Sequence, residues 1–569
     1  MPDKFRKRIK KRIFIPGILA GLLISGIVCY WLATRINPPG IRDKSAELLK
    51  VERSGEDFYR CKNDWLKKSK SGLWEMYLEG NPFERGVING KLCKDLLEIQ
   101  EADFLDQIRV IVPSTFYQRF LKYFIYWFNR NLDKNIPEEY KEEIYGISLS
   151  ASDKFTLIGS NYQRLLNYHS AHDIGHALQD LRLVGCTSFG VWAGLSRDSS
   201  LLIGRNFDFY IGDAFDENKI VCFTKPDRGY PFMMVTWAGM VGTVSGMNMR
   251  GLTVTINAAK SKIPYSARTP ISILAREILQ YAVNIEEAYR IAQKRETFVS
   301  ESILIGSAED HCTAIIEKSP FHLELVRTRN HYMICTNHFQ GSTFRNDPVN
   351  LKDARENASM YRYKRVLQDI TNEQPLDIKD VASILRDRAG LNNTNIGMGN
   401  EKAINQLIAH HSIIFEPEKR LVWVSTNPWQ LGEYVCYNLS EIFNNFARSG
   451  QKNEITDLSK TIAPDEFLDS DNYKSFRKFK SMQKYFREVI RSQGKEKINR
   501  SFISEFIATN PFYYEVYSMT GDYYRSLNRP DNAMYYYRLS LGKVIPRQNE
   551  KDGIIEKLSD CIVKTNNKQ

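Results

Sequence analysis

The sequence lacks the cysteine patterns that mark disulfide frameworks and metal sites. Its nine cysteines, at 29, 61, 93, 186, 222, 312, 335, 436 and 561, include no C-x-x-C pair and no metal-ligand spacing. Their odd number also argues against a disulfide framework. Cys222, Cys312, Cys335 and Cys436 lie in apolar runs typical of strands, where thiols are usually buried and inert. We therefore expect neither a bound metal nor a cofactor.

Motifs for nucleic-acid binding are also missing, although the net charge is +12. Seven of the basic residues lie between Lys4 and Arg12, so the rest of the chain is only mildly basic. We expect no nucleic-acid partner. An apolar content of 43% and an aromatic content of 12% describe a globular protein. At 569 residues the chain is too long for one core, and two or three domains are expected.

Charge is absent from the 21 residues between Ile13 and Ala33, a length that can span a bilayer. With the basic residues before it, this run predicts a signal anchor with a cytoplasmic N-terminus. The rest of the chain would then be extracytoplasmic, or periplasmic in a bacterium. A cleaved signal peptide is the alternative. The predicted division is a basic tail (1–12), a transmembrane anchor (13–33), a helical segment (41–185), a domain of alternating strands and helices (186–440) and a helical module (441–569).

Two short motifs contain the residues best suited to chemistry. Cys186 opens an apolar, strand-like stretch, and a second strand-like stretch leads into Arg205 and Asp208. The polar residues 197–200 between them predict a hairpin turn. A hairpin would bring Arg205 and Asp208 beside Cys186, from which 19 and 22 residues separate them. A nearby cation lowers a thiol pKa, so this pattern favours a cysteine nucleophile over an inert thiol.

These motifs resemble those of the cysteine N-terminal-nucleophile (Ntn) hydrolases, which include choloylglycine hydrolase, penicillin V acylase and acid ceramidase. The acyl-CoA:6-aminopenicillanate acyltransferase branch fits best, because Cys186 is internal and follows Gly185. Further matching segments are residues 79–86, residues 245–252 running on to Asn257, and residues 335–339, which contain Asn337. The resemblance covers roughly residues 70 to 440. It implies an α+β fold, a four-layer αββα sandwich, with which the alternating strands and helices of this region agree.

The resemblance also implies a mechanism. The Gly185–Cys186 bond is cut by the protein itself, which gives Cys186 a free α-amine that acts as the base for its own thiol. Arg205 would stabilise the thiolate, Asp208 would orient the ammonium, and Asn257 and Asn337 would donate to the tetrahedral oxyanion. The motif residue Met249 stands where the family often has Glu. Arg362 and His411 could also approach the site. The implied activity is cleavage or transfer of an acyl group from a linear amide or ester, on an acylated small molecule or lipid.

Four residues before Gly185 share one helical face: His169, His172, Asp173 and His176. They could line the active site, hold a transition metal, or form an ordinary polar face. Residues 116–128 are strongly aromatic, which predicts a helix packed in the core or against the catalytic domain, or else a wall for an acyl chain or a contact with the membrane.

The C-terminal residues 512–541 look like one tetratricopeptide-type helix pair. One such pair cannot bury its own face, so it should pack on neighbouring helices, and a protein partner could bind there. This leaves a rival function of another class. In that alternative, the chain is a catalytically inactive Ntn fold that acts as a membrane-anchored interaction protein through its tail.

Overall fold

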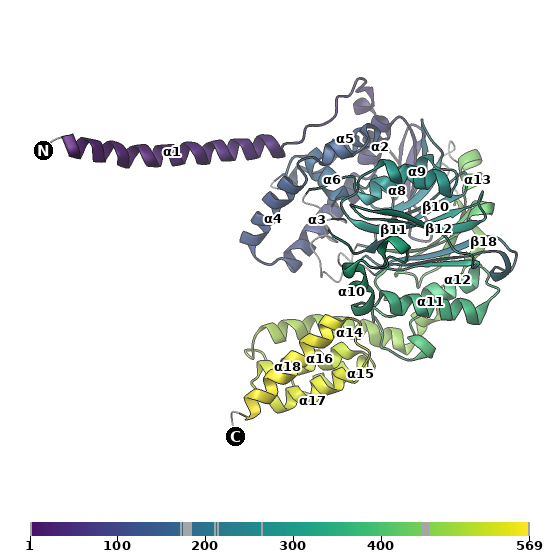
Figure 1. Cartoon of the computed structure of the whole chain (residues 1–569). Helices are drawn as coiled ribbons and strands as arrows, with labels where there is room; N and C mark the ends of the chain where they lie inside the picture. Colours follow the sequence, from purple (N-terminus) through teal and green to yellow (C-terminus); the bar gives the residue numbers. More distant parts are fainter. Residues whose placement is uncertain are drawn as a thin grey trace.

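The computed structural model describes residues 3–156, 158–170, 173, 185–209, 212, 215–262, 266–446 and 454–566. Two β-sheets lie face to face at the centre, with helices on their outer faces, and a separate group of helices extends from one end (Figure 1). This mixed α and β architecture is consistent with the expected sandwich.

The larger sheet has eleven strands in the order β1-β2-β3-β4-β7-β8-β9-β10-β11-β12-β13. Their bounds are β1 Glu52–Gly55, β2 Phe58–Cys61, β3 Asp64–Lys68, β4 Trp74–Gly80, β7 Ile220–Pro226, β8 Phe232–Thr236, β9 Ser245–Asn248, β10 Leu252–Ala259, β11 Ser300–Ser307, β12 Cys312–Lys318 and β13 Leu323–Val326. Every neighbouring pair is antiparallel except β4 and β7, which are parallel. The N-terminal part of the chain therefore joins the sheet through one parallel pairing.

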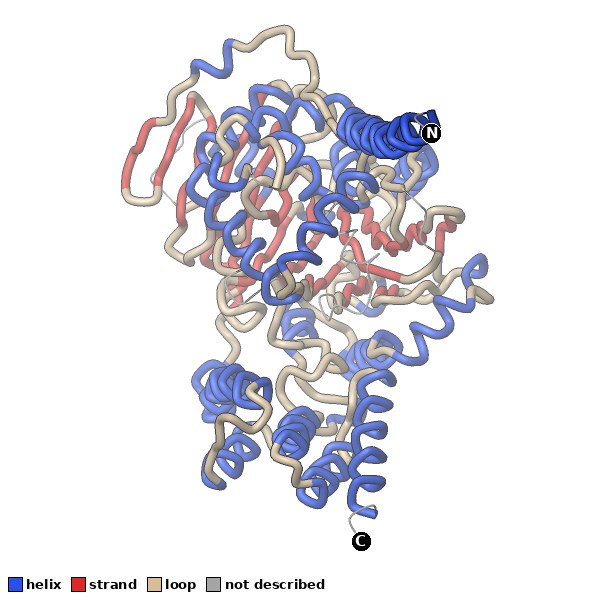
Figure 2. Tube along the Cα trace, turned by 90° about the vertical axis from the view of Figure 1, so that its left-hand side faces the viewer, coloured by secondary structure: helices blue, strands red, loops and turns tan. Residues whose placement is uncertain are grey.

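The smaller sheet has seven strands in the order β14-β5-β6-β15-β16-β17-β18. Their bounds are β5 Thr187–Val191, β6 Leu202–Phe207, β14 Tyr332–Cys335, β15 His411–Glu416, β16 Leu421–Ser425, β17 Tyr434–Asn438 and β18 Thr456–Ile462. Strands of this sheet and of the larger one appear as two stacked layers in the turned view (Figure 2).

Successive side chains of a strand point to opposite faces of its sheet, so a separate hydrophobic core lies on each face. In β7, Val221 and Phe223 pack between the sheets, whereas Ile220 and Cys222 belong to the outer core of the larger sheet. That outer core is covered by α2 (Pro82–Leu92), α5 (Glu138–Ser148), α6 (Asn161–His169), α8 (Ile271–Tyr281) and α9 (Ile285–Lys294). On the smaller sheet, α11 (Ser359–Glu373) and α12 (Ile378–Arg386) cover the outer face, and α10 (Pro348–Glu356) precedes them.

The N-terminal segment differs from the mostly helical prediction, because residues 52–80 form four strands. Its helices are α2, α5, α6, α3 (Lys94–Ile111) and α4 (Thr115–Phe128). α2 and α3 break at Cys93, within the segment that the sequence predicts as helical. The strands were missed because charged residues interrupt their apolar pattern and their sheet neighbours are distant in sequence.

The prediction of a transmembrane anchor over residues 13–33 is wrong, and so is the single-pass topology drawn from it. These residues form part of α1 (Asp3–Thr34), which extends away from the body (Figure 1). No helix within the described residues is long and apolar enough to cross a membrane.

The C-terminal helices have a hydrophobic core of their own. They are α14 (Asp471–Arg491), α15 (Arg500–Thr509), α16 (Tyr514–Ser526), α17 (Pro530–Leu541) and α18 (Gln548–Asn566), and the short α13 (Leu439–Glu441) ends the preceding domain. β18 lies after residue 441 yet pairs with β17 in the smaller sheet, so the helical module begins later than the sequence suggested. α16 and α17 are the predicted helix pair, and they pack with α14, α15 and α18, as expected for a pair that cannot bury its own face.

Candidate active site

The hairpin predicted around Cys186 is confirmed. β5 and β6 pair antiparallel, with Ser188 opposite Arg205 and Thr187 opposite Asn206. Cys186 immediately precedes β5 and Asp208 immediately follows β6, so both lie at the same end of the hairpin. Local pairing thus brings together residues that are about twenty positions apart in the chain.

The thiol of Cys186 is buried, with only 1% of the residue exposed. Arg205 Nη2 donates to Sγ at 3.7 Å. Burial raises the pKa of Cys186 to about 11, although the charge of Arg205 acts in the opposite direction. At neutral pH in the uncut chain this thiol is therefore protonated, and a nearby base must take its proton before it can attack.

Arg205 is fixed by groups on the opposite sheet. Its Nη1 donates to the carbonyl oxygen of Val244 at 2.5 Å and to Ser245 Oγ, and its Nη2 donates to the carbonyl oxygen of Ile256. The guanidinium also stacks on Phe207, 4.6 Å from the ring centroid. Arg205 is thus a rigid cation that joins the two sheets at Cys186.

Two buried histidines form a hydrogen-bonded chain that ends at Ser245, the hydroxyl partner of Arg205. His411 Nε2 lies 2.8 Å from Ser245 Oγ, and His410 Nδ1 lies 2.9 Å from His411 Nδ1. Burial, followed by neighbouring cationic or histidine groups, holds both histidine pKa values well below the usual range. Both rings are therefore neutral at physiological pH, and His411 reaches Arg205 through Ser245 rather than touching Cys186.

Asp208 is the group at the site that titrates near neutral pH. Burial raises its pKa to about 7, against the lowering effect of Arg362 and Arg205. Its backbone carbonyl oxygen accepts from the Gly185 N–H at 2.9 Å. Its Oδ2 accepts from Gln406 Nε2 at 3.2 Å, and Oδ1 has no hydrogen-bond partner among the residues described. Asp208 therefore has one carboxylate oxygen available for a proton.

The carbonyl oxygen of Gly185 accepts from two side chains. Arg362 Nη1 and Gln406 Nε2 both donate to it at 2.6 Å. Arg362 Nη1 also donates to the Cys186 carbonyl oxygen at 2.5 Å and to Thr187 Oγ1 at 2.8 Å. The peptide bond between Gly185 and Cys186 is thus held on its carbonyl side by a guanidinium and an amide.

The two asparagines proposed as oxyanion donors occupy different positions. Asn337 lines the cavity described below, its Nδ2 donates to the Ala258 carbonyl oxygen at 2.9 Å, and its Oδ1 accepts from Arg362 at 2.7 Å. Asn257 donates to the Cys335 carbonyl oxygen at 3.0 Å and accepts from Ser188 Oγ at 2.7 Å, so in the uncut chain it bridges the two sheets. Both assignments stay predictions, and the geometry favours Asn337.

The motif at residues 245–252 builds a turn. Asn248 Oδ1 accepts from the backbone N–H groups of Arg250 and Leu252, and its Nδ2 donates to two carbonyl oxygens at the end of α8. Gly251 has a φ of +75°, where a side chain would be strained. Ser245, which opens this motif, is the residue that contacts Arg205. The motif therefore positions the site without lining it.

The predicted histidine face is only partly described. His169 is buried, its Nδ1 lies 2.9 Å from the Leu165 carbonyl oxygen and its Nε2 accepts from the Val241 N–H, so it is a structural residue. Asp173 accepts from the N–H of Ile271 at 2.9 Å. His172 and His176 lie outside the described residues. Within the described part of the chain, no group of three or more His, Cys, Asp or Glu could hold a metal.

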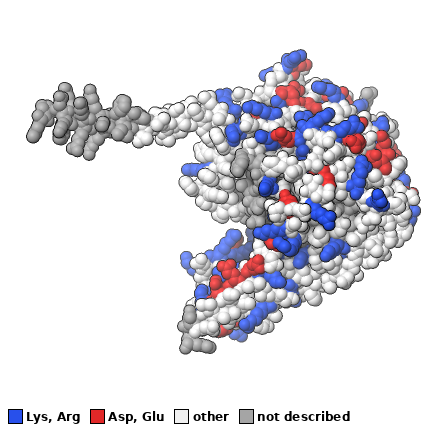
Figure 3. Space-filling view, in the orientation of Figure 1, with Lys and Arg blue, Asp and Glu red and all other residues white. Residues whose placement is uncertain are grey.

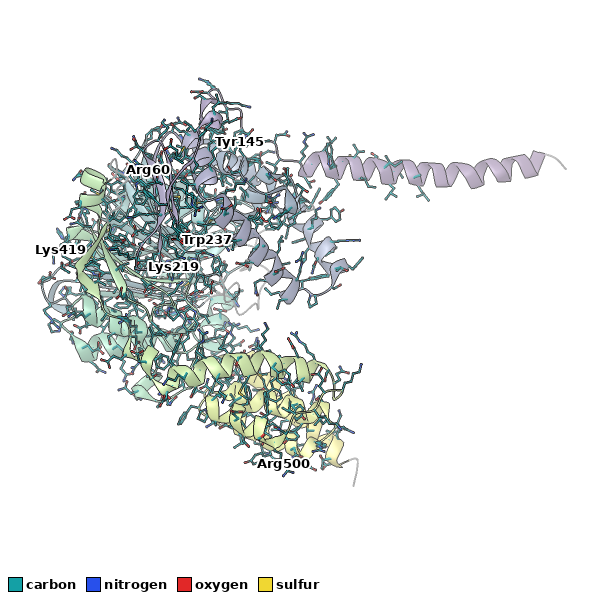
Figure 4. All side chains as sticks on the ribbon, turned by 180° about the vertical axis from the view of Figure 1, so that it is seen from behind. Arg60, Tyr145, Lys219, Trp237, Lys419 and Arg500 are labelled. Carbon is teal, nitrogen blue, oxygen red and sulfur yellow. The ribbon has the colours of Figure 1, made fainter. Side chains whose placement is uncertain are left out.

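A cavity of about 880 Å³ adjoins the site. Its apolar wall comes from α3, α4 and the sandwich; its lining includes Leu97, Phe104, Ile108, Leu121, Ile125, Phe215 and Trp237. Gly185, Asn337, Arg362 and Gln406 also line it, with the ion pairs Lys260–Asp353 and Glu401–Arg547. The surface is hollowed between the region of α3 and α4 and the C-terminal helices (Figure 3). Trp237 lies in the sandwich part of the chain, well away from Arg500 on those helices (Figure 4).

Gln406 is the site residue that sequence reasoning missed, and Arg362 was named without a role. Neither lies in one of the recognised motifs. Arg362 is 177 residues from Gly185 and Gln406 is 221 residues from it. The two polar residues 405 and 406 between the buried Ile404 and Leu407 give no local signal for a contact so distant, so only the three-dimensional structure identifies it.

Residues 195–427 match the family model described as acyl-coenzyme A:6-aminopenicillanic acid acyl-transferase. Among curated proteins, an uncharacterized protein of Archaeoglobus fulgidus is 25% identical over 44% of this chain and 44% of its own length. Protein dcd1B of Dictyostelium discoideum is 22% identical over 44% of this chain and 51% of its own. The chain thus matches about half the length of these curated relatives.

Two solved structures give further similarity. An N-acylethanolamine-hydrolyzing acid amidase ortholog of Caenorhabditis elegans is 16% identical, with 41% of this chain and 93% of that chain covered and a TM-score of 0.30. A mutant conjugated bile acid hydrolase of Clostridium perfringens is 13% identical, with 48% and 96% covered and a TM-score of 0.31. The family model includes Arg205 and Asp208 and begins after Cys186, and it supports the resemblance to the Ntn superfamily that the motifs indicate.

Proposed function

We propose that the protein is a self-cleaving cysteine hydrolase or acyltransferase that forms an acyl-enzyme on Cys186. The observation that carries this proposal is the environment of the Gly185–Cys186 bond. The thiol accepts from Arg205, the carbonyl oxygen accepts from two further donors, and Asp208 lies beside them. A nucleophile, a polarised carbonyl and a candidate base thus surround one peptide bond.

Self-cleavage needs a base other than the α-amine of Cys186, because that nitrogen is still part of the peptide bond. Asp208, with a pKa of about 7 and one free oxygen, suits this role. It takes the thiol proton as Sγ attacks the Gly185 carbonyl carbon. The C–N bond then breaks, the nitrogen takes a proton to become the α-amine, and a thioester forms. Water hydrolyses the thioester, leaving the Gly185 carboxylate and the free Cys186 thiol.

In the cut protein the α-amine of Cys186 becomes available as the base. Model α-amino and thiol groups have pKa values of about 8 and about 8.5, so a proton can pass between them near neutral pH. The thiolate attacks the acyl carbonyl of the substrate, Asn337 donates to the oxyanion, and the amine or alcohol leaves. Water completes hydrolysis, or an acceptor amine or alcohol completes transfer.

The cavity supports an acylated substrate with an apolar acyl group. Its α3 and α4 wall is mostly apolar, and the groups around Cys186 lie at a polar part of the same cavity. Burial of an acyl chain there would contribute about 0.8 kcal/mol per methylene. The ion pairs Lys260–Asp353 and Glu401–Arg547 suit a polar leaving group or acceptor.

Denaturing electrophoresis with N-terminal sequencing tests this proposal. The wild type should give two chains, residues 1–185 and 186–569, and the larger chain should begin at Cys186. Cys186→Ala should stay a single inactive chain, whereas Cys561→Ala, at a buried cysteine of the C-terminal module, should be cut normally. An active wild type that runs as one uncut chain would refute the mechanism.

A thiol-directed acyl probe separates an enzyme from an inactive scaffold. The cut wild type should be labelled, and Cys186→Ala should not be. Labelling that survives in Cys186→Ala, or a cut wild type that never labels, would favour the interaction-protein alternative.

A further inference from the structure

Gln406 hydrogen-bonds to two groups that take part in the proposed self-cleavage, the scissile carbonyl and the candidate base. Its Nε2 donates to the Gly185 carbonyl oxygen at 2.6 Å and to Asp208 Oδ2 at 3.2 Å. The side chain is 2% exposed and lies in the segment between η6 (Leu391–Asn393) and β15. No other element shares this pair of contacts among the described residues, so Gln406 links the scissile carbonyl to the candidate base.

The shape of the backbone at Gly185 is matched to Gln406. A Cβ built on Gly185 would lie 2.6 Å from both Nε2 and Oε1 of Gln406, and 3.0 Å from its Cδ. Real Cβ atoms do not approach so closely, so any other residue at 185 would displace the amide. Gly185 therefore leaves the space that the Gln406 amide occupies, and this is a specific reason for glycine before the nucleophile.

We propose that Gln406 is a catalytic residue of self-cleavage and that it contributes more to cutting than to acyl turnover. This inference rests on the proposed function, because it assigns a residue to the cutting step. As Cys186 Sγ bonds to the Gly185 carbon, the carbonyl oxygen gains negative charge, and the Gln406 amide and the Arg362 guanidinium both donate to it. When the C–N bond breaks and the nitrogen takes a proton, the oxygen loses this negative charge and the carbonyl double bond forms again.

The two steps differ in what Gln406 can contact. Before cutting, its amide is held by an oxygen of the chain itself. Hydrolysis of the thioester turns that oxygen into part of a chain-end carboxylate, which is no longer bonded to Cys186. Turnover then uses the substrate carbonyl, for which Asn337 is the proposed donor. Loss of the Gln406 amide should therefore slow cutting far more than turnover.

Gln406→Met tests the inference, because methionine keeps the length of the side chain and removes the donor. Freshly purified full-length chain is incubated, and the fraction cut is followed by denaturing electrophoresis. Cutting should slow about a hundredfold, as for loss of one oxyanion donor. Turnover of an acyl probe, expressed per cut molecule, should fall much less than the cutting rate does. Gln483→Ala, at a buried glutamine of α14, is the matched control and should be cut at the wild-type rate.

Gln406→Asn provides a second test if the methionine variant melts well below the wild type. Asparagine keeps the amide but withdraws it by one methylene, so cutting should again slow strongly. Normal cutting of a folded Gln406→Met chain would overturn the inference and leave the proposed function intact. A turnover loss per cut molecule as large as the cutting loss would also overturn it. A wild type that never cuts would instead overturn the proposed function, and the inference with it.

A double mutant examines the link to glycine. Gly185→Ala should slow cutting because its methyl group displaces the Gln406 amide, and Gln406→Ala should slow it by removing that amide. If both act through the same contact, the double variant should be no slower than Gln406→Ala alone. Fully additive slowing would show that Gly185 is needed for another reason and would overturn the explanation of its role.

Discussion

At the scale of single residues, burial sets which group at the site titrates near neutral pH. The Cys186 thiol has its pKa raised to about 11 by burial, which Arg205 only partly offsets. The pKa of the Asp208 carboxyl is raised to about 7 by the same effect. Each shift penalises the charged form, because a buried anion loses its hydration. The uncut site is therefore a neutral thiol beside a carboxyl that changes charge at physiological pH.

The rate of self-cleavage should rise as the pH increases through about 7 and then level off. Below that pH Asp208 is protonated and cannot take the thiol proton; above it the carboxylate is ionised and acts as the base. Stopped time courses between pH 5 and 9 on full-length chain measure this. Asp208→Asn should abolish cutting, while Asp457→Asn, at a half-buried aspartate of β18, should behave as the wild type. A wild-type rate that is independent of pH would contradict this role.

Asn337→Ala should lower acyl turnover by about a hundredfold or more, as expected for loss of an oxyanion donor. Turnover is measured per cut molecule, so that any slower processing does not enter the result. Asn63→Ala, at an exposed asparagine that donates to Glu79, serves as the control for the same substitution elsewhere. If Asn337→Ala turns over at the wild-type rate, Asn337 has only the structural contacts described above.

Sequence motifs predicted the local part of the site. The Cys186–Arg205–Asp208 group follows from one hairpin, which patterns of apolar and turn residues indicate. The contacts of Arg362 and Gln406 with Gly185 depend on where the fold places α11 and the segment before β15. The local sequence pattern around these residues does not predict such long-range contacts. Asn257 shows the opposite case. It matches a motif, yet its described partners join strands.

At the scale of elements, α4 is a helix without a buried residue. Phe116, Phe120 and Trp127 are exposed, while residues on another side, among them Leu121 and Ile125, line the cavity. α4 is therefore not a core helix, but Ile125 and Phe128 pack against the outer core of the larger sheet, so packing against the catalytic domain and a cavity wall both agree with the structure. Aromatic content alone could not separate these alternatives, because it does not say which face meets the protein.

Leu121→Trp should shift acyl preference toward shorter chains, because the larger ring fills part of the cavity. Phe120→Trp, next to it on the helix but 56% exposed and outside the cavity lining, is the matched control. Turnover of a series of acyl probes of increasing length measures the preference. An unchanged length profile in Leu121→Trp would mean that α4 does not bound the acyl group.

Strand prediction succeeded where apolar residues alternate or run together, and failed at the N-terminal edge. The alternating strands and helices predicted for residues 186–440 are present there, with β7, β8, β10, β11, β12, β14, β15 and β16 among the strands. Residues 52–80 carry many charged residues, so their strands depend on pairing with the larger sheet rather than on their own pattern.

At the scale of the whole molecule, the C-terminal helices reach the cavity. Arg547, between α17 and α18, lines it and pairs with Glu401 at 2.6 Å. The Lys402 ammonium donates to the Ile545 carbonyl oxygen at 2.9 Å, and Asn400 donates to that of Val544. The module is therefore joined to the segment that contains Gln406 and is not a separate appendage.

Arg547→Ala should raise KM for the acyl substrate while leaving self-cleavage unchanged, because Arg547 does not contact the Gly185–Cys186 bond in the described structure. Steady-state kinetics on cut protein and a cutting time course test the two parts. Arg500→Ala, on α15 of the same module, should change neither. Equal KM values for Arg547→Ala and wild type would show that Arg547 does not bring the module into substrate binding.

The parallel pairing of β4 with β7 would make the structure of the cut protein depend on its having folded as one uncut chain. These strands lie on opposite sides of the Gly185–Cys186 bond, yet they are adjacent in one sheet along seven residue pairs, from Trp74 opposite Ile220 to Gly80 opposite Pro226. An intact chain brings them together as neighbours in a single folding reaction. After cutting, the same pairing would have to form between two separate molecules. The cut protein would thus owe its persistence to slow unfolding rather than to reversible equilibrium, and fragments made separately would not reproduce it.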